Sequence, residues 1–133
     1  MQTSQIPSVD GHPRPVILLV EDEASIREIA GEVLSSAGYR VLESSGPTEA
    51  LRVAAQHRVD LLLTDIVMPE MNGPELARRL VERQPGLITM YMSGYAQRAL
   101  DVTQNGSLHI QKPFSVRSLL EHVAQAISSG KRN

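Results

Sequence analysis

The chain has 133 residues, which is typical of one domain, and its 41% hydrophobic and 21% charged residues are ordinary for a globular protein. A net charge of −2 argues against a nucleic acid or an anionic membrane surface as the partner, and the absence of cysteine excludes disulfides and thiolate metal sites. No apolar run approaches the roughly 20 residues that a membrane helix needs.

Polar segments flank the part of the chain that is expected to fold. Residues 1–14 are rich in proline and polar residues and predict a flexible lead-in or linker, while residues 130–133 predict a flexible tail. The domain is therefore expected to span residues 15–129. The segment up to Pro15 lacks the basic-then-apolar pattern of a signal peptide, so we expect a cytoplasmic protein without membrane insertion.

The first half of the domain predicts two strands and two helices. Val16–Val20 is a continuous apolar run typical of a strand that is buried on both faces. A helix follows and ends at Gly38; its apolar side chains at helical spacing are Ile26, Ile29, Ala30, Val33, Leu34 and Ala37. Tyr39–Glu43 predicts the second strand, and Gly46-Pro47 starts the next helix with proline at its first position.

The second half repeats this alternation three times. The strands are predicted over Val59–Thr64, Leu87–Met92 and Leu108–Gln111. The helices are predicted from Pro74 to about residue 84, from about Ala96 to Gln104, and after a capping Ser115. The first of these should bury Leu76, Ala77, Leu80 and Val81, and the last should bury Val116, Leu119, Leu120, Val123, Ala124 and Ile127.

Strict alternation of strands and helices predicts an α/β fold with helices on both faces of a parallel sheet. For five strands we expect the flavodoxin-like (βα)5 doubly wound fold with strand order 2-1-3-4-5. Ligands of such sheets bind beyond the carboxyl ends of the strands, in the crevice between the first and third strands.

Polar residues stand at four of these strand ends. Glu21-Asp22-Glu23 follows the first strand, and the third, fourth and fifth strands end in Asp65, Ser93 and Lys112. Carboxylates brought this close together repel one another unless a cation or a proton intervenes, and oxygen ligands suit Mg²⁺. Because a lysine and a hydroxyl can bind phosphoryl oxygens, and an aspartate beside Mg²⁺ can act as a nucleophile, the set indicates phosphoryl transfer onto an aspartate.

Each residue taken alone also has a structural interpretation. Asp22 or Glu23 could cap the helix that begins near Ala24, and Asp65 could be a turn residue before Pro69. Lys112 could be a solvated surface lysine, and Ser93-Gly94 could be a simple turn. The functional interpretation depends on their coincidence at the strand ends.

The sequence resembles the receiver domains of response regulators in two-component signalling over roughly residues 15–128. The matching segments are Leu18–Glu23, Thr64–Gly73, Met92–Tyr95 and Gln111–Phe114. The resemblance implies that Asp65 is the phospho-acceptor and that Asp22, Asp65 and the backbone carbonyl of Val67 bind Mg²⁺. It also implies that Glu21 acts through a coordinated water, and that Ser93 and Lys112 contact the phosphoryl group.

Further features implied by the resemblance concern the switch and its lifetime. The bond before Pro113 is expected to be cis, and His109 occupies the position of the family's switch aromatic residue. His109 could equally be a partly exposed strand residue. Val67 and Tyr95 occupy positions that tune phosphoryl lifetime; as an aliphatic and an aromatic side chain, they predict slow hydrolysis.

The resemblance also implies partners. A histidine kinase or a phosphotransfer domain would donate the phosphoryl group, and a dimer that forms on phosphorylation is left open. The Met-Ser-Gly-Tyr segment and the polar lead-in favour the C-terminal receiver of a hybrid histidine kinase over a stand-alone regulator.

Two other classes of protein fit the sequence less well. An aspartate-nucleophile phosphatase would need a second aspartate where Val67 stands, and a pseudo-receiver would lack the acceptor or the lysine. The sequence therefore predicts a switch domain rather than a turnover enzyme.

Overall fold

The computed structural model describes residues 13–94 and 108–130. The strands are β1 (Val16–Val20), β2 (Arg40–Ser44), β3 (Leu61–Asp65), β4 (Ile88–Ser93) and β5 (Leu108–Gln111). The helices are α1 (Ala24–Ser36), α2 (Pro47–Ala54), α3 (Gly73–Arg83) and α5 (Val116–Gly130). The helix expected over residues 96–104 lies outside the described residues, as do most of the expected lead-in and tail.

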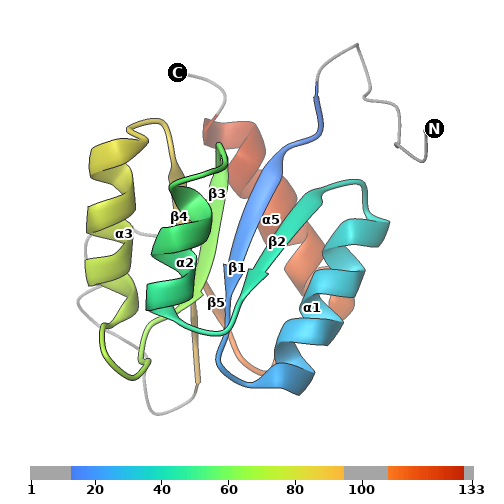
Figure 1. Ribbon diagram of the computed structural model, residues 1–133. Coiled ribbons are helices and arrows are strands. Elements are labelled where there is room, and N and C mark those ends of the chain that lie inside the picture. Colours follow the sequence, from blue (N-terminus) through green and yellow to red (C-terminus); the bar gives the residue numbers. More distant parts are fainter. Residues whose placement is uncertain (1–12, 95–107, 131–133) are drawn as a thin grey trace, which may run out of the picture.

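The five strands form one parallel sheet in the order β2-β1-β3-β4-β5 (Figure 1). The predicted fold and strand order are therefore confirmed. Because β1 lies between β2 and β3, the crossover direction of the chain changes there, and the loops after β1 and β3 meet at one edge of the sheet.

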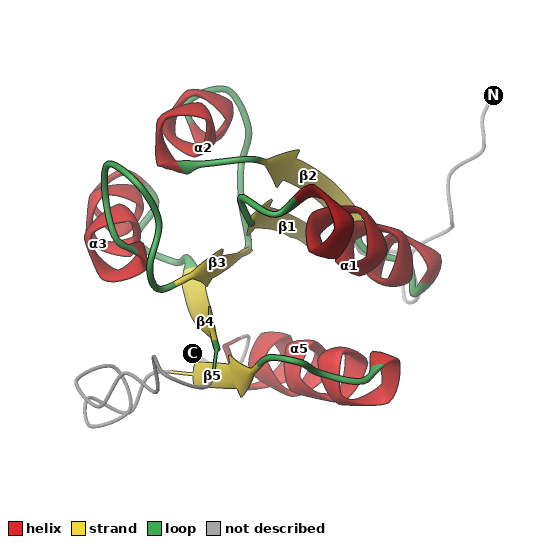
Figure 2. Ribbon diagram, turned by 90° about the horizontal axis from the view of Figure 1, so that it is seen from below, coloured by secondary structure: helices red, strands yellow, loops and turns green. Residues whose placement is uncertain are grey.

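Helices cover both faces of the sheet. Figure 2 shows α2 and α3 on one side and α1 and α5 on the other. Successive strand residues point to opposite faces, so β1 contributes Leu18 to the core under α2 and α3, and Ile17 and Leu19 to the core under α1 and α5. This two-sided burial explains why the strands are continuous apolar runs rather than alternating ones.

Several element boundaries differ from the predicted ones by one or two residues. The strand β3 begins at Leu61 instead of Val59, because the Val59 amide donates to the Gln84 side chain at 2.8 Å rather than to a strand. Helix α3 begins one residue before Pro74, where the Asn72 side chain accepts from the Glu75 amide at 2.8 Å. The predicted Ser115 cap is confirmed, with its hydroxyl 2.9 Å from the Ser118 amide.

Five residues expected on apolar helix stripes are exposed instead. Ile29 and Val116 are 60% and 54% exposed, Val81 is 37% exposed, and Ala37 and Ala124 are also on the surface. The predicted stripes were too wide, because each helix packs against one face of the sheet and only the central part of its apolar stripe is covered. On α5, Ala126 is buried instead of Ala124.

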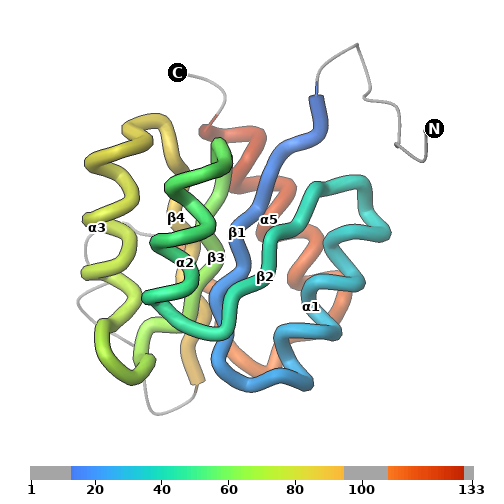
Figure 3. The backbone as a smooth tube through the Cα atoms, in the orientation of Figure 1, coloured from blue at the N-terminus to red at the C-terminus, as the bar shows by residue number. Residues whose placement is uncertain are grey.

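The described chain enters β1 and leaves α5 at the same edge of the sheet, at the top of Figure 3. The loops after β1 and β3 lie at the opposite edge. None of the helices in the described part of the chain combines the length and apolar character needed to cross a bilayer.

Candidate functional site

Three carboxylates converge where β1 and β3 end. Oxygens of Glu21, Asp22 and Asp65 lie within 4.8 Å of one another. Glu21 and Asp65 are buried, at 1% and 4% exposure, whereas Asp22 is exposed. Close negative charges repel one another, and the repulsion is strong where water is excluded, so this cluster favours the binding of a cation.

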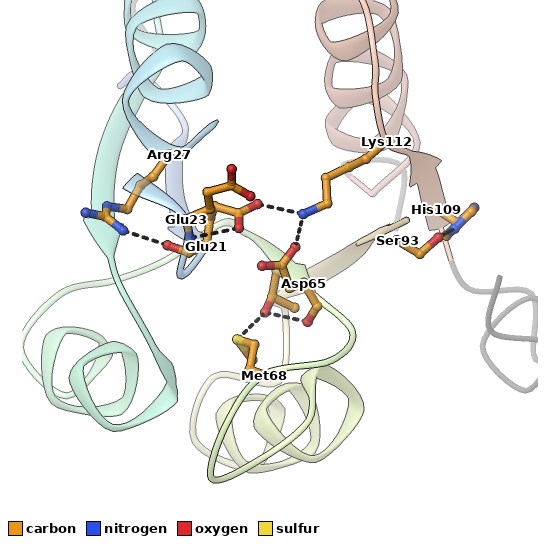
Figure 4. A network of polar contacts seen from close by, with 9 residues as sticks. Glu21, Glu23, Arg27, Asp65, Met68, Ser93, His109 and Lys112 are labelled. Atoms are coloured by element: carbon orange, nitrogen blue, oxygen red, sulfur yellow. Dashed lines mark hydrogen bonds and ion pairs between the residues drawn. The ribbon is translucent and has the colours of Figure 1, made fainter. Parts of the chain in front are cut away.

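Lys112, which directly follows β5, provides a positive charge at the cluster. Its Nζ lies 2.8 Å from Asp65 Oδ1 and 3.0 Å from Glu21 Oε1, so it bridges the two buried carboxylates (Figure 4). The Lys112 amide donates to the Ser93 carbonyl at 2.7 Å, which ties the residue to the end of β4. The Lys112–Pro113 peptide bond is cis.

The pKa values of Asp65 and Lys112 both lie above the ordinary values of these groups. Burial raises the pKa of Asp65 to about 7, with a further contribution from Glu21, and Lys112 opposes the shift. Burial lowers the pKa of Lys112, but its hydrogen bonds with Asp65 and Glu21 outweigh this effect, and the pKa lies above the ordinary lysine value. Lys112 therefore stays charged at neutral pH, while Asp65 is poised between its two protonation states in the absence of metal.

The raised pKa of Asp65 predicts a pH dependence of stability. A carboxyl group with a higher pKa in the folded state stabilises the fold below its unfolded value of 3.8, and this contribution is lost as the pH rises to about 7. In the presence of a chelator, we expect the free energy of unfolding of the wild type to fall relative to Asp65→Asn between these values. The slope should be at most about 1.4 kcal/mol per pH unit in urea denaturation. Parallel pH profiles for the two proteins would contradict the prediction.

In the loop after β1, Glu21 is fixed by backbone hydrogen bonds, whereas the Glu23 side chain is exposed. The Glu23 amide donates to Glu21 Oε2 at 3.1 Å, and the Glu21 amide donates to the Ser44 carbonyl at 3.1 Å. The Glu23 side chain is exposed at the N-terminus of α1 and makes no capping hydrogen bond there. Of the three consecutive acids, Glu21 and Asp22 thus belong to the cluster and Glu23 does not.

Ser93, at the end of β4, is fully buried, and its hydroxyl makes a hydrogen bond with Nε2 of His109. In Figure 4 the Ser93 hydroxyl is turned toward His109 and away from the Asp65–Lys112 pair. The contact is diagonal across two strands, because His109 is paired with Tyr91, two residues before Ser93. The ring nitrogen can accept or donate in this bond, depending on its tautomer.

Val67 and Tyr95 are the two residues predicted to tune phosphoryl lifetime. Val67 lies in the loop after β3 with its side chain 56% exposed, and Tyr95 lies outside the described residues. One residue at the site is not predicted from the sequence: Arg27 on α1 donates from Nη1 to the Glu21 carbonyl at 2.8 Å. Its signal was a cation in the first turn of a helix, where the helix dipole disfavours positive charge.

The donor set fits a hard divalent cation. Glu21, Asp22 and Asp65 offer only carboxylate oxygens, and the exposure of Asp22 leaves room for water molecules on that side. Mg²⁺ prefers one or two carboxylates together with water and phosphate oxygens. A cation at this position would lie beside Asp65 and opposite Lys112, so that both could act on the same anionic group.

Comparisons with known proteins find relatives over most of the chain. Residues 17–124 match the family model of the response regulator receiver domain. The chain is 37% identical to the response regulator receiver protein CpdR of Brucella abortus, over 84% of this chain and 95% of that protein. It is 35% identical to the sensor kinase CckA of the same organism, over 84% of this chain but only 12% of the kinase.

Solved structures give the same result. A response regulator receiver protein from Sinorhizobium medicae superposes with a TM-score of 0.78 at 29% identity, covering 88% of this chain and 97% of that one. Matches therefore include both a protein of this length and a single segment of a much longer kinase.

Proposed function

Because this chain belongs to the response regulator receiver family of two-component signalling, we propose that it is a Mg²⁺-dependent switch that accepts a phosphoryl group on Asp65. The observation that carries the proposal is the position of the buried Asp65 carboxylate, which shares the acidic cluster with Asp22 and is bridged by Lys112. A partner kinase's phosphohistidine is the proposed donor.

The transfer exchanges one bond to phosphorus for another. An Asp65 carboxylate oxygen attacks the phosphorus, the P–O bond forms, and the P–N bond of the donor phosphohistidine breaks. The histidine nitrogen keeps the electron pair and takes up a proton. Lys112 is already within hydrogen-bond distance of Asp65, and this position supports its proposed role as the cation that meets a phosphoryl oxygen.

Asp22, Asp65 and the backbone carbonyl of Val67 are the proposed ligands of Mg²⁺, with Glu21 acting through water. When bound, Mg²⁺ neutralises charge on the transferred group and on the acceptor. Glu21 is already engaged by Lys112 and by the Glu23 amide, which supports an indirect role for it.

The donor is proposed to be a histidine kinase or a phosphotransfer domain. The similarity to the sensor kinase CckA supports this class of partner, and so does an apolar surface beside the site. Ile26, Ile29, Pro113 and Phe114 line an open pocket of about 440 Å³ that includes Lys112. A donor protein that covers this pocket would hold its phosphohistidine near Asp65 and exclude water from the transfer.

The direct test is labelling by a small phosphodonor. We expect acetyl phosphate to add one phosphoryl group, seen by intact-mass spectrometry, in the presence of Mg²⁺ and not in the presence of a chelator. Labelling that is equally fast in both conditions would overturn the metal-dependent mechanism.

Asp22 and Glu23 provide a matched pair for testing the metal site. We expect Asp22→Ala to weaken Mg²⁺ binding at least about tenfold, or about 1.4 kcal/mol, because it removes a direct ligand and its charge. Glu23→Ala should have a much smaller effect, since this exposed side chain lies outside the cluster. Titration calorimetry measures the Mg²⁺ affinity of both variants. An equal loss of affinity in the two would mean that Asp22 is not the acid that binds the metal directly.

The Ser93–His109 contact predicts a spectroscopic change. If the Ser93 side chain rotates away from His109 to reach a phosphoryl oxygen, its hydrogen bond with His109 breaks. We therefore expect the His109 ring ¹⁵N signals to move when beryllofluoride, a phosphoryl mimic, binds the Mg²⁺-loaded domain. Unchanged ring signals would assign His109 to the strand alone, without a part in switching.

A further inference from the structure

Arg27 contacts the backbone of the loop that carries the acidic cluster. Its Nη1 donates to the Glu21 carbonyl at 2.8 Å, reaching from α1 back over the end of β1 (Figure 4). Its Nε lies 4.0 Å from Glu43 Oε1 on β2, and its side chain is only 20% exposed. Arg27 is thus a largely buried arginine held between a helix, a strand and the loop.

The Glu21–Asp22 peptide depends on such contacts for its orientation. The Glu21 amide is held by the Ser44 carbonyl, and the Glu21 carbonyl by Arg27. Within the described residues, the Asp22 carboxylate takes no hydrogen bond and no ion pair. Its direction toward Asp65 is therefore set by the backbone at Glu21 and Asp22, and Arg27 fixes one of the two peptide groups involved.

The positive charge of Arg27 does not by itself favour Mg²⁺ binding at the cluster. A positive charge near the acidic cluster opposes the binding of a cation, and a positive charge in the first turn of α1 is also disfavoured by the helix dipole. Both effects argue that Arg27 contributes through the geometry of its hydrogen bond rather than through its charge.

We propose that Arg27 is a positioning residue for the Mg²⁺ ligand Asp22, acting through the Glu21 carbonyl. The inference rests on the proposed function, since it requires the acidic cluster to bind Mg²⁺. It predicts that removing the positive charge of Arg27 weakens Mg²⁺ binding, because Asp22 is no longer held in place. A pure charge effect would change the Mg²⁺ affinity in the opposite direction.

The test is a titration of the wild type, Arg27→Met and Arg27→Lys with MgCl2, followed by ¹H–¹⁵N NMR. We expect Arg27→Met to weaken Mg²⁺ binding roughly tenfold, in the range found when the partner of a ligand is removed. Arg27→Lys keeps the charge, and its Mg²⁺ affinity should lie between those of the wild type and Arg27→Met, because one amine replaces the planar guanidinium. The Asp22 amide signal of the metal-free protein should shift in both variants.

Arg52 provides the matched control. It lies on α2 and lines an open pocket together with Asp22. Arg52→Met removes a nearby positive charge while the Arg27–Glu21 hydrogen bond remains, so Mg²⁺ binding should stay equal or become slightly tighter.

The outcomes separate this inference from the proposed function. If the wild type shows no Mg²⁺-dependent shifts at Asp22 and Asp65, the proposed metal site itself is wrong and the inference falls with it. If the wild type binds and Arg27→Met binds equally well or more tightly, only the inference is overturned. If Arg27→Met does not fold, Arg27→Lys decides alone: unchanged affinity contradicts the positioning role, because a charge effect predicts no change there.

Discussion

Replacing Asp65 with asparagine should abolish phosphorylation of the domain by acetyl phosphate in Mg²⁺. The carboxylamide of asparagine is not a nucleophile at neutral pH, and it removes one negative charge from the cluster with Glu21 and Asp22. Intact-mass spectrometry should detect a phosphorylated species in the wild type and none in Asp65→Asn.

A loss of labelling has to be separated from a general defect in the fold. Asp65 ends β3, and Asp60 directly precedes that strand, where its side chain accepts from the Val16 amide at 2.8 Å. Asp60→Asn makes the same chemical change at the opposite edge of the sheet, and an asparagine oxygen can still accept that bond. Asp60→Asn should be labelled normally; undiminished labelling of Asp65→Asn would place the acceptor on another residue.

The sheet and the strand-end residues could be predicted from the sequence because both follow from local patterns. Continuous apolar runs between helical patterns specify a parallel sheet, and the residue that ends each run then lies at one edge. Asp65 and Lys112 are 47 positions apart, yet the strand order alone was enough to predict that they would lie close together.

The remaining contacts depend on information that no local pattern contains. The apolar spacing of α1 and α5 predicts a buried stripe but not its width, which is why Ile29 and Val116 were wrongly expected in the core. The Ser93–His109 hydrogen bond depends on the register of β4 against β5. Arg27 is a cation in the first turn of a helix, but that position does not indicate its hydrogen bond to the Glu21 carbonyl, six residues earlier.

Lys112 should have opposite effects on metal binding and on phosphorylation. Its Nζ contacts Glu21 and Asp65, which are both buried, so Lys112→Ala leaves their negative charges without this cation. Removal of a positive charge beside the cluster should tighten Mg²⁺ binding. The same change removes the donor that meets the phosphoryl group, and we expect labelling by acetyl phosphate to slow by roughly a hundredfold.

The two measurements together distinguish a phosphoryl-binding lysine from a structural one. Lys112→Arg keeps the charge, so its Mg²⁺ affinity should stay near that of the wild type. Its labelling rate should nevertheless fall, because the larger, planar guanidinium does not reproduce the position of an amine that lies 2.8 Å and 3.0 Å from two carboxylate oxygens. Metal titration and labelling rates in saturating Mg²⁺ give both quantities for each protein. If Mg²⁺ affinity and labelling rate fell together in Lys112→Ala, the lysine would serve to hold the carboxylates in place, and its proposed contact with the phosphoryl group would be wrong.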